Sequence, residues 1–220
     1  MKREIITTAD GSVTIYLPEM EETYHSKFGA VQEAYHVFIK NGLDLTQSQP
    51  VSVLEIGFGT GLNALITLDE SLRKGQQITY IGVEAYPVSA EEVSAINYAD
   101  MVGAGRHKEL FMLMHSLPWG ERAPVNANFS LLKRKQFFHE IEDSELYDLI
   151  YFDAFGYHVQ PELWSAEIFG KMYNALKSNG ILVTYACRTP IKKAMQEAGF
   201  VTEKLPGPPG KREMLRAVKR

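Results

Sequence analysis

The sequence predicts an α/β fold in which a mostly parallel sheet is covered by helices and completed by an antiparallel hairpin at its C-terminal end. Short runs rich in Val, Ile, Leu and Tyr alternate with segments of helical length, and these runs are apolar on both faces. That pattern is typical of parallel strands with helices on both sides. The last two strand-like runs are separated only by residues 206–210, Pro-Gly-Pro-Pro-Gly, so no crossover helix can join them and they must pair antiparallel.

The expected main sheet has seven strands. They are predicted at 51–56, 78–83, 129–132, 147–152, 181–185, 200–204 and 213–218. Helices are predicted at 62–73, 89–98, 161–176 and 190–198. The stretch from 97 to 128 shows no clear period, and Pro118-Trp119-Gly120 marks an irregular segment within it.

An N-terminal appendage is expected before the first strand of this sheet. Ala9-Asp10-Gly11 separates two β-type runs, and Asp-Gly is a strong hairpin signal. Residues 29–40 place apolar side chains at helical spacing and end at Asn41-Gly42, a typical helix stop. We therefore expect a hairpin and a helix over residues 1–46 to pack on a main domain over residues 47–220.

Composition excludes several classes of protein. The chain is 45% hydrophobic and 23% charged, which is typical of a globular domain and unlike a disordered chain. It has no apolar run of about 18 residues and no leader pattern, so we expect a cytoplasmic protein without a membrane partner. Cys187 is the only cysteine, which excludes an intramolecular disulfide and a cysteine-based metal cluster. The six histidines show no metal-ligand spacing, so no metal site is expected.

Charge is distributed unevenly along the chain. The formal net charge is −4, but residues 188–220 hold nine Lys or Arg and three Glu, a local charge of +6 that leaves −10 for residues 1–187. A basic C-terminal face of this kind suits phosphate, because bound Lys and Arg release counterions from nucleic acid. An ordinary solvated surface explains the charge equally well.

A glycine-rich segment follows the first strand of the predicted sheet. Gly57, Gly59 and Gly61 lie between a strand and a helix, where doubly wound folds bind their ligands. Their G-x-G-x-G spacing differs from the G-x-G-x-x-G that holds a pyrophosphate. Glu55 beside the loop would repel two phosphates but suits a cation. We therefore expect S-adenosylmethionine, a sulfonium, rather than NAD.

Two further positions are expected to contact this cofactor. Glu84 ends the second strand, where an acid can accept hydrogen bonds from both ribose hydroxyls. NAD-binding proteins use an acid in the same way, so Glu84 alone does not discriminate. Gln136, after the third strand, can meet the adenine amino group with its amide oxygen. Residues 133–135, Lys-Arg-Lys, come just before it, and an exposed charged turn explains them as well as a role at the cofactor does.

The fourth strand delivers Asp153 to the same edge of the sheet. Methyl transfer requires a nucleophile with a free lone pair about 3 Å from the methyl carbon. An amine is mostly protonated at neutral pH, so Asp153 can bind the ammonium and take its proton while Phe155 walls the site. The alternative role for Asp153 is a helix cap. Cys187 is interpreted as a buried residue at a strand end rather than a nucleophile.

Several motifs together resemble one known family. They are Tyr24-His25-Ser26 with Gly29-Ala30 and Glu33-Ala34, residues 53–63, Leu117-Pro118-Trp119-Gly120, Phe152-Asp153-Ala154-Phe155, Ala198-Gly199-Phe200 and Gly210-Lys211-Arg212-Glu213-Met214-Leu215. They are similar to the methyltransferase domain of MnmC, including the stand-alone form called MnmD, over nearly the whole chain. Gly-Phe-Gly-Thr-Gly-Leu-Asn and Lys-Arg-Glu-Met-Leu are far more specific than a glycine loop alone.

The resemblance implies a class I, Rossmann-like methyltransferase that methylates the exocyclic amine of 5-aminomethyl-2-thiouridine at the wobble position of tRNA. It implies that Asp153 lies next to that amine. Cofactor contacts are expected for Glu55, Gly57, Phe58, Gly59, Gly61, Asn63, Glu84 and Gln136, the last replacing an acid common among methyltransferases. Substrate contacts are expected for Tyr24, His25, Ser26, Lys211 and Arg212.

Three alternatives and one partner complete the expectations. The flavin-dependent domain of MnmC is not found in the chain, so a separate flavin-dependent oxidoreductase is expected to act in the same pathway. A class I methyltransferase acting on a small-molecule amine is the main alternative, and the negative net charge favours it. An NAD-dependent oxidoreductase is disfavoured by the glycine spacing. A non-catalytic module is disfavoured because Glu55, Glu84 and Asp153 are all present.

Overall fold

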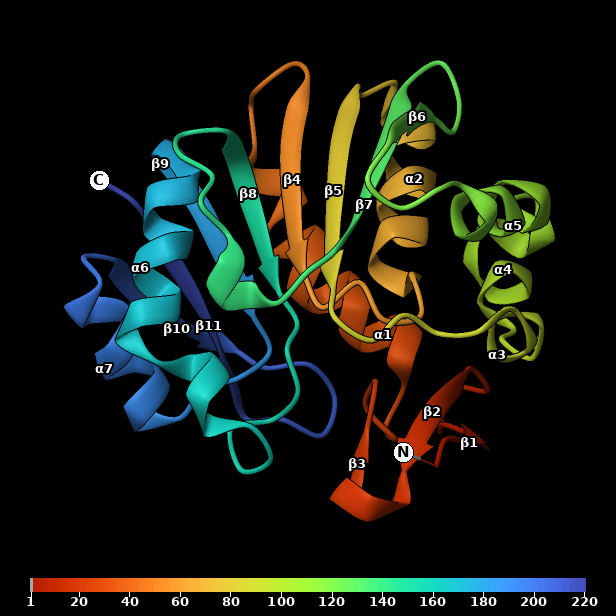
Figure 1. The fold of residues 1–220 in the computed structure, drawn as a ribbon, viewed down its shortest axis with the longest axis horizontal. Coiled ribbons are helices and arrows are strands. Elements are labelled where there is room, and N and C mark those ends of the chain that lie inside the picture. The colour runs from red at the N-terminus through yellow and green to blue at the C-terminus, as the bar shows by residue number, and fades with distance from the viewer. Residues whose placement is uncertain (1) are drawn as a thin grey trace.

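A computed structural model describes residues 2–220 and contains an eight-stranded main sheet in the order β10-β11-β9-β8-β4-β5-β7-β6 (Figure 1). The strands are β4 (Val51–Ile56), β5 (Ile78–Glu84), β6 (Arg122–Pro124), β7 (Phe129–Lys135), β8 (Tyr147–Phe152), β9 (Leu176–Thr184), β10 (Val201–Pro206) and β11 (Glu213–Val218). Strands β7, β5, β4, β8 and β9 run parallel, and β11 pairs antiparallel with both β9 and β10. The predicted fold class, including the closing hairpin, is confirmed.

The sheet contains one strand more than the seven predicted. The additional strand, β6, has three residues and pairs antiparallel with the edge strand β7. Three residues are too few to show an alternating pattern, and Pro124 argues against a strand except at a sheet edge. Its position at the edge explains both why it forms and why the sequence does not reveal it.

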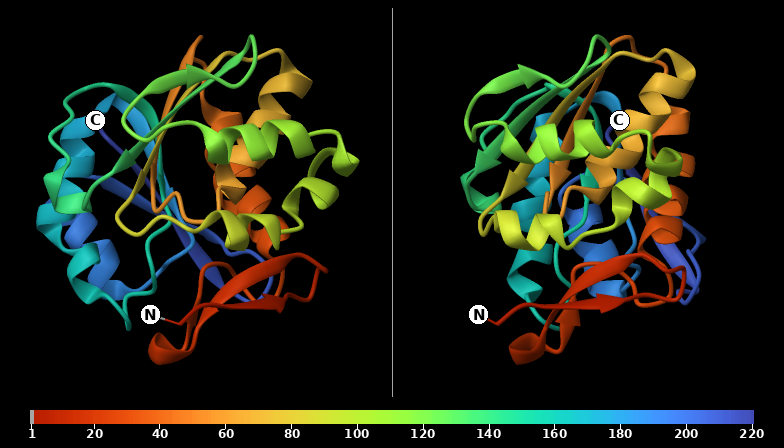
Figure 2. Two further views of the ribbon diagram at one scale, coloured as in Figure 1. Left: turned by 45° about the vertical axis from the view of Figure 1, so that its right-hand side comes forward. Right: turned by 90° about the vertical axis from the view of Figure 1, so that its right-hand side faces the viewer.

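Helices cover both faces of the sheet (Figures 1 and 2). The helices are α1 (Ala30–Ala34), the π-helical η2 (Tyr35–Lys40), α2 (Leu62–Lys74), α3 (Ala90–Ser94), α4 (Tyr98–Met101), α5 (Lys108–Ser116), α6 (Ala166–Ala175) and α7 (Thr189–Glu197). Short 3-10 turns are η1 (Pro18–Met20), η3 (Leu43–Leu45), η4 (Val102–Gly105), η5 (Phe138–Glu140) and η6 (Pro161–Trp164). One core cluster joins η2, α2, α4 and α5 to one face of the sheet, and a second joins α6 and α7 to the other.

Two predicted helices have different bounds in the structure, and one helix was not predicted. The segment 89–98 is divided into α3 and α4: at Asn97 the backbone leaves the helical conformation (φ −103°, ψ 13°), and the Asn97 side chain accepts a hydrogen bond from the Val13 amide (2.9 Å). The helix expected at 161–176 begins as the turn η6. It becomes α6 only after Ser165, whose side chain accepts a hydrogen bond from the Ile168 amide. Helix α5 lies in the stretch that shows no clear period in the sequence.

The N-terminal segment forms a small antiparallel sheet of its own, at the edge where the parallel strands end (Figure 1). It contains β1 (Glu4–Thr7), β2 (Val13–Leu17) and β3 (Glu22–Thr23). The hairpin of β1 and β2 agrees with the prediction, whereas β3 was not predicted. Arg3 Nη1, just before β1, donates to Glu92 Oε2 (2.9 Å) in α3, so this small sheet is attached to that helix.

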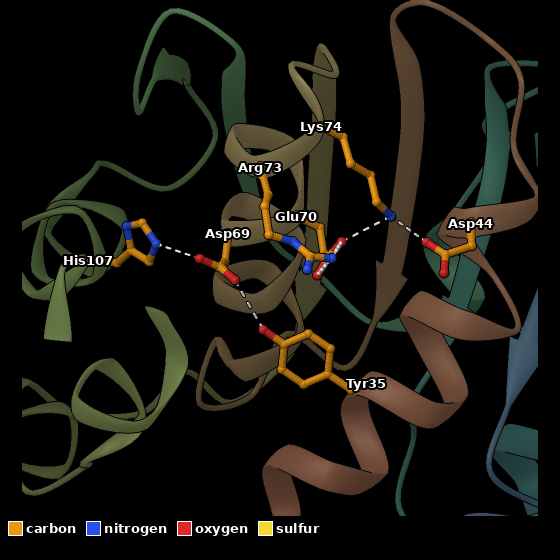
Figure 3. Close-up of polar contacts among 7 residues, drawn as sticks. All are labelled: Tyr35, Asp44, Asp69, Glu70, Arg73, Lys74 and His107. Carbon is orange, nitrogen blue, oxygen red and sulfur yellow. Dashed lines mark hydrogen bonds and ion pairs between the residues drawn. The ribbon is translucent and has the colours of Figure 1, made fainter. Parts of the chain in front are cut away.

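Polar contacts fix α2, the helix that follows the glycine loop (Figure 3). Tyr35 in η2 donates its hydroxyl to Asp69 (3.2 Å), and the other oxygen of Asp69 lies 2.7 Å from Nε2 of His107, just before α5. The next residue, buried Glu70, pairs with Lys74 (2.9 Å) one turn further along α2. The two contacts of Asp69 join three segments that are far apart in the sequence and hold the C-terminal half of α2 in place.

Among residues 2–220, no helix has both the length and the apolar character needed to span a bilayer. In the same residues, no group of three or more His, Cys, Asp or Glu side chains is arranged to hold a metal ion.

Candidate active site

The glycine loop joins β4 to α2 and requires glycine for two separate reasons. Gly57, Gly59 and Gly61 have φ values of 91°, 50° and 75°, in the left-handed region that glycine adopts without strain. A Cβ atom on Gly57 would lie 2.5 Å from the backbone oxygen of Asp153. A Cβ atom on Gly59 would lie 3.1 Å from the Tyr24 ring. The loop therefore packs closely against both the end of β8 and the N-terminal segment.

Glu84 at the end of β5 holds this loop. Its carboxylate accepts hydrogen bonds from the Gly59 amide (3.0 Å) and the Tyr86 amide (2.9 Å). Beside it lies a surface pocket of about 570 Å³ lined by Arg3, Ala85, Tyr86, Pro87, Ser89, Glu92 and Lys135. An acid fixed by two backbone amides next to a pocket of this size suits the ribose of a nucleoside.

Gln136 follows β7 near the same pocket and is partly exposed. The sequence did not single out the aromatic residues around it. Tyr86 and Phe137 are both exposed and pack edge to face, with 5.9 Å between ring centroids. Exposed aromatic rings at the carboxyl ends of two strands offer a surface on which a base can stack.

Two residues expected at the cofactor have their side chains beneath the loop instead. Glu55 is 1% exposed and accepts hydrogen bonds from the Tyr80 hydroxyl (2.9 Å) and from Asn63 (2.9 Å). Phe58 is 3% exposed and lies on Gly82, where a Cβ atom would come within 2.3 Å of its ring. Burial raises the pKa of Glu55 well above its ordinary value. In this arrangement neither side chain is open to a ligand, and Glu55 acts on the site through Asn63.

Asn63 connects the interior to the candidate catalytic acid. Its Nδ2 donates to Glu55 Oε1 (2.9 Å) and to Asp153 Oδ2 (2.8 Å), while its Oδ1 is buried without a partner. The pKa of Asp153 is raised to about 7: burial is the main cause and the charge of Glu33 adds to it, whereas the hydrogen bond from Asn63 and the charge of Lys211 act in the opposite direction. Asp153 is thus a carboxyl group that exchanges its proton near neutral pH.

A cavity of about 590 Å³ opens in front of Asp153, between the N-terminal segment, the end of β9 and the β10–β11 loop. It brings together six residues that the sequence singled out: Tyr24, His25, Ser26, Asp153, Lys211 and Arg212. Its wall also contains Glu33, Tyr157, Tyr185 and Cys187. Phe155 is not in the wall; its ring packs edge to face on Tyr24, with 5.1 Å between centroids. The fold therefore joins the N-terminal and C-terminal motifs at one place.

His25 fastens the N-terminal segment to the glycine loop. Its Nε2 lies 2.8 Å from the Thr60 hydroxyl, and that hydroxyl donates to Tyr98. Burial lowers the pKa of His25 to about 4, and the nearby charge of Lys211 lowers it as well. The imidazole is therefore neutral at neutral pH and binds Thr60 as a hydrogen-bonding group without charge.

Lys211 lies inside the cavity rather than on an open basic face. Its ammonium forms an ion pair with Glu33 of α1 and lies 3.9 Å from the centroid of the Tyr185 ring. Arg212, the next residue, is exposed at the rim. Sequence reasoning did not assign Glu33 or Tyr185 to the site. Glu33 belongs to the Gly-Ala and Glu-Ala motif near the N-terminus, which was the available signal.

Two expectations near the site are wrong. Residues 133–135 are not an exposed turn, because β7 continues through Lys135. Lys133 is 1% exposed and donates to the His115 carbonyl (2.7 Å). Cys187 is partly exposed in the cavity wall rather than buried, because β9 ends three residues earlier. Burial raises the pKa of its thiol, which makes it a poor nucleophile.

Comparisons with known proteins agree with this geometry. Residues 122–220 match the family described as S-adenosyl-L-methionine-dependent methyltransferase. The chain is 30% identical over 213 residues to the tRNA 5-methylaminomethyl-2-thiouridine biosynthesis bifunctional protein MnmC of Leptospira borgpetersenii (strain JB197), which covers 89% of this chain and 32% of that protein. It is 30% identical over 222 residues to the protein of the same name from Polaromonas naphthalenivorans, covering 94% of this chain and 34% of that protein. The chain thus spans about a third of the length of these relatives.

Solved structures show the same fold. The crystal structure of MNMC2 from Aquifex aeolicus matches with a TM-score of 0.75 and 22% identity, over 98% of this chain and 70% of that chain. Spermidine synthase from Thermotoga maritima matches with a TM-score of 0.60 and 16% identity, over 99% of this chain and 69% of that chain.

Proposed function

The chain belongs to the MnmC-like, S-adenosyl-L-methionine-dependent methyltransferases, and we propose from this that it methylates the exocyclic amine of 5-aminomethyl-2-thiouridine at the wobble position of tRNA. The observation that carries the proposal is the position of Asp153. Its side chain faces the cavity, while its backbone oxygen touches the glycine loop at Gly57. A group able to bind an ammonium ion therefore lies directly beside the loop that would hold the methyl donor.

The residues at the edge of the sheet fit S-adenosylmethionine. The glycine loop presents backbone without side chains at the edge of the sheet, and the positive φ values of Gly57, Gly59 and Gly61 give the tight turn that lets a ligand approach this backbone. Glu84 offers acceptors for the ribose hydroxyls, and Gln136 lies where an adenine amino group would need a partner. The unpaired Oδ1 of Asn63 is a further acceptor close to Asp153. When bound, the cofactor supplies a methyl group on a sulfonium.

Asp153 prepares the amine. The substrate amine arrives mostly as an ammonium ion, which the carboxylate of Asp153 attracts and orients. Because the pKa of Asp153 is raised to about 7, the carboxylate takes the ammonium proton readily, and the amine nitrogen regains its lone pair. Asn63 keeps the carboxylate in one orientation through its 2.8 Å hydrogen bond. The ring of Tyr24 lines the cavity beside Asp153 and is held in place by the ring of Phe155 behind it.

The rim of the cavity suits a nucleic acid. Lys27, Arg188 and Arg212 line it and are exposed, and among residues 2–220 none of the three has a carboxylate within ion-pair distance. Cations without a carboxylate partner around the mouth of a cavity that contains Asp153 can contact the phosphates that flank a single inserted nucleotide. This local arrangement favours tRNA over a small-molecule amine, despite the negative net charge.

We also propose that a separate flavin-dependent oxidoreductase acts in the same pathway and that the protein works in the cytoplasm. The relatives are named as bifunctional proteins, and this chain matches about a third of their length. The second activity would then come from a different part of the protein or from another protein.

The experiment that tests the proposal is methylation of tRNA by the purified protein with S-adenosylmethionine. We expect tRNA carrying the 5-aminomethyl group to gain one methyl group, detected by mass spectrometry of its nucleosides, whereas tRNA without that group gains none. Methylation of free alkyl amines with no activity on tRNA would overturn the proposal and favour the small-molecule alternative.

Salt dependence tests the role of the rim. Arg212→Ala is expected to weaken tRNA binding and to reduce the slope of log K against log salt by about 1. Arg122→Ala is the control, because Arg122 is equally exposed but lies on β6 at the opposite edge of the sheet. Equal effects of the two substitutions would show that general charge, not the rim, binds the tRNA.

A further inference from the structure

The ammonium group of Lys211 lies inside the cavity and occupies a place where an alkylammonium ligand could bind. The Lys211 ammonium lies between the carboxylate of Glu33 and the face of the Tyr185 ring, 3.9 Å from the ring centroid. A carboxylate together with an aromatic face is a general way to bind an alkylammonium ion. Lys211 thus shows that this part of the cavity binds a primary ammonium on an alkyl chain, which is the chemical group of the proposed substrate.

Glu33 has more bonding capacity than Lys211 uses. Its side chain is 10% exposed, and Oε2 is buried without a hydrogen-bond partner, although an ionised carboxylate that is removed from water normally needs several. Oε1 alone is paired with Lys211. The carboxylate is therefore incompletely satisfied in the free protein, as expected for a binding group that awaits a ligand.

This place adjoins the candidate catalytic acid. Glu33, Tyr185, Lys211 and Asp153 all line the same cavity, and the charges of Glu33 and Lys211 both act on the pKa of Asp153. The Tyr185 hydroxyl also donates to the backbone oxygen of Ala154 (2.8 Å), next to Asp153. An ammonium held by Glu33 and Tyr185 is thus close to the carboxylate that would remove its proton.

Lys211 can leave this place without disrupting a strand. It lies in the loop between β10 and β11, directly after Gly210, and its side chain is 31% exposed. Arg212 beside it is exposed on the rim, where phosphates are expected. If Lys211 leaves the cavity, its ammonium therefore moves from the Glu33 carboxylate toward a phosphate at the rim. The substrate ammonium can then take its place, and the net charge of the cavity stays the same.

We infer that Glu33 and Tyr185 form an alkylammonium subsite that Lys211 occupies in the free protein and that the amine of the substrate occupies in the complex, where Lys211 is released toward phosphate. The substrate half of this inference rests on the proposed function. The subsite itself does not, because it is defined by Glu33, Tyr185 and the ammonium already between them.

The test uses ethylammonium chloride as the probe and needs neither tRNA nor cofactor. In Lys211→Met, which keeps the length of the side chain but removes its charge, ethylammonium is expected to bind at least about tenfold more tightly than in the unsubstituted protein. Binding is measured as the rise in melting temperature with concentration, against sodium chloride at the same ionic strength. Lys177→Met is the matched control, since Lys177 forms an ion pair of similar exposure with Asp148 (2.9 Å) outside the cavity and its loss should leave the affinity unchanged.

Adding Glu33→Gln to Lys211→Met is expected to abolish the gain. Tyr185→Phe keeps the ring and should preserve it, whereas Tyr185→Leu should reduce it several-fold. Equal affinity in Lys211→Met and the unsubstituted protein, or an unchanged gain after Glu33→Gln, would overturn the inference. If Lys211→Met is poorly folded because Glu33 is left unpaired, ethylammonium but not sodium should restore its cooperative unfolding; a failure to do so counts against the subsite.

The two proposals can fail separately. A protein that binds ethylammonium as described but does not methylate tRNA would retain the subsite and lose the proposed function. A protein that methylates tRNA but shows no difference between these variants in ethylammonium binding would retain the function and lose the subsite.

Discussion

Replacing Asp153 with asparagine is expected to have opposite effects on activity and stability. The substitution keeps the shape of the side chain and an oxygen that can accept the hydrogen bond from Asn63, but it removes the charge and the site of protonation. An amide cannot take the proton of an ammonium ion. We therefore expect kcat/KM for methylation to fall by about 10² to 10⁴, the usual contribution of a positioned acid or base.

The gain in stability follows from the pKa of Asp153. Its ordinary value is 3.8, and burial raises it to about 7 in the folded protein. Between these values the folded state binds a proton that the unfolded state does not, so the free energy of unfolding falls as the pH rises from about 4 to about 7. Raising this pKa from 3.8 to about 7 corresponds to about 4 kcal/mol at most. Solvent screening of a partly exposed carboxyl reduces this, and we expect about 2 kcal/mol.

Urea denaturation of both proteins at several pH values checks this reasoning. At pH 4, where Asp153 is largely protonated in the folded state, the two proteins should be about equally stable. At pH 8, Asp153→Asn should be more stable by about 2 kcal/mol. A gain that does not depend on pH, or a loss of stability at pH 8, would refute the assignment of a raised pKa to this carboxyl group and with it the proposed proton transfer.

Three further predictions concern the parts that hold the site together. The pKa of His25 is lowered to about 4 by burial, so its folded state resists protonation and stability should decrease as the pH falls from 6.5 to 4; His25→Gln should remove that part of the pH dependence in urea denaturation. Gly57→Ala should destabilise the protein by about 2 kcal/mol or more, because its Cβ would meet backbone at 2.5 Å, whereas Gly75→Ala, with φ of 63° but open space, should lose only about 1 kcal/mol in the same assay. Asp69→Asn weakens the bond to His107 and should lower the free energy of unfolding by about 1 kcal/mol. Amides in α2 should then exchange hydrogen faster, and unchanged or slower exchange would contradict this role.

The sequence was informative wherever the periodic pattern of a whole element was present. Strands β4, β8 and β11 begin and end at the predicted residues, because each is a continuous apolar or alternating run bounded by turn signals. The antiparallel hairpin was also predictable, since a loop too short for a crossover leaves no other pairing. Short elements such as β3 and β6 carry too few residues to show a period, and their pairing depends on a neighbouring strand.

The candidate site was predicted in part. The position of a residue at the end of a parallel strand places it at the ligand-binding edge, so Glu84 and Asp153 could be located from local sequence. The direction of a side chain does not follow from its position. Glu55 points into the interior and bonds to Tyr80, which lies 25 residues away and on another strand. Only the register of β4 and β5 brings the two together.

The sequence by itself thus determined the fold class, the glycine loop and the acid at the end of β8, because each depends on local pattern and on the regular geometry of parallel strands. Only the tertiary structure decided that Lys211 lies against Glu33, 178 residues away, and that both face Asp153. The physical reason is that a buried charge needs a partner, and any acid in the chain can serve. Which acid it is depends on how the N-terminal helix and the C-terminal hairpin pack around one cavity.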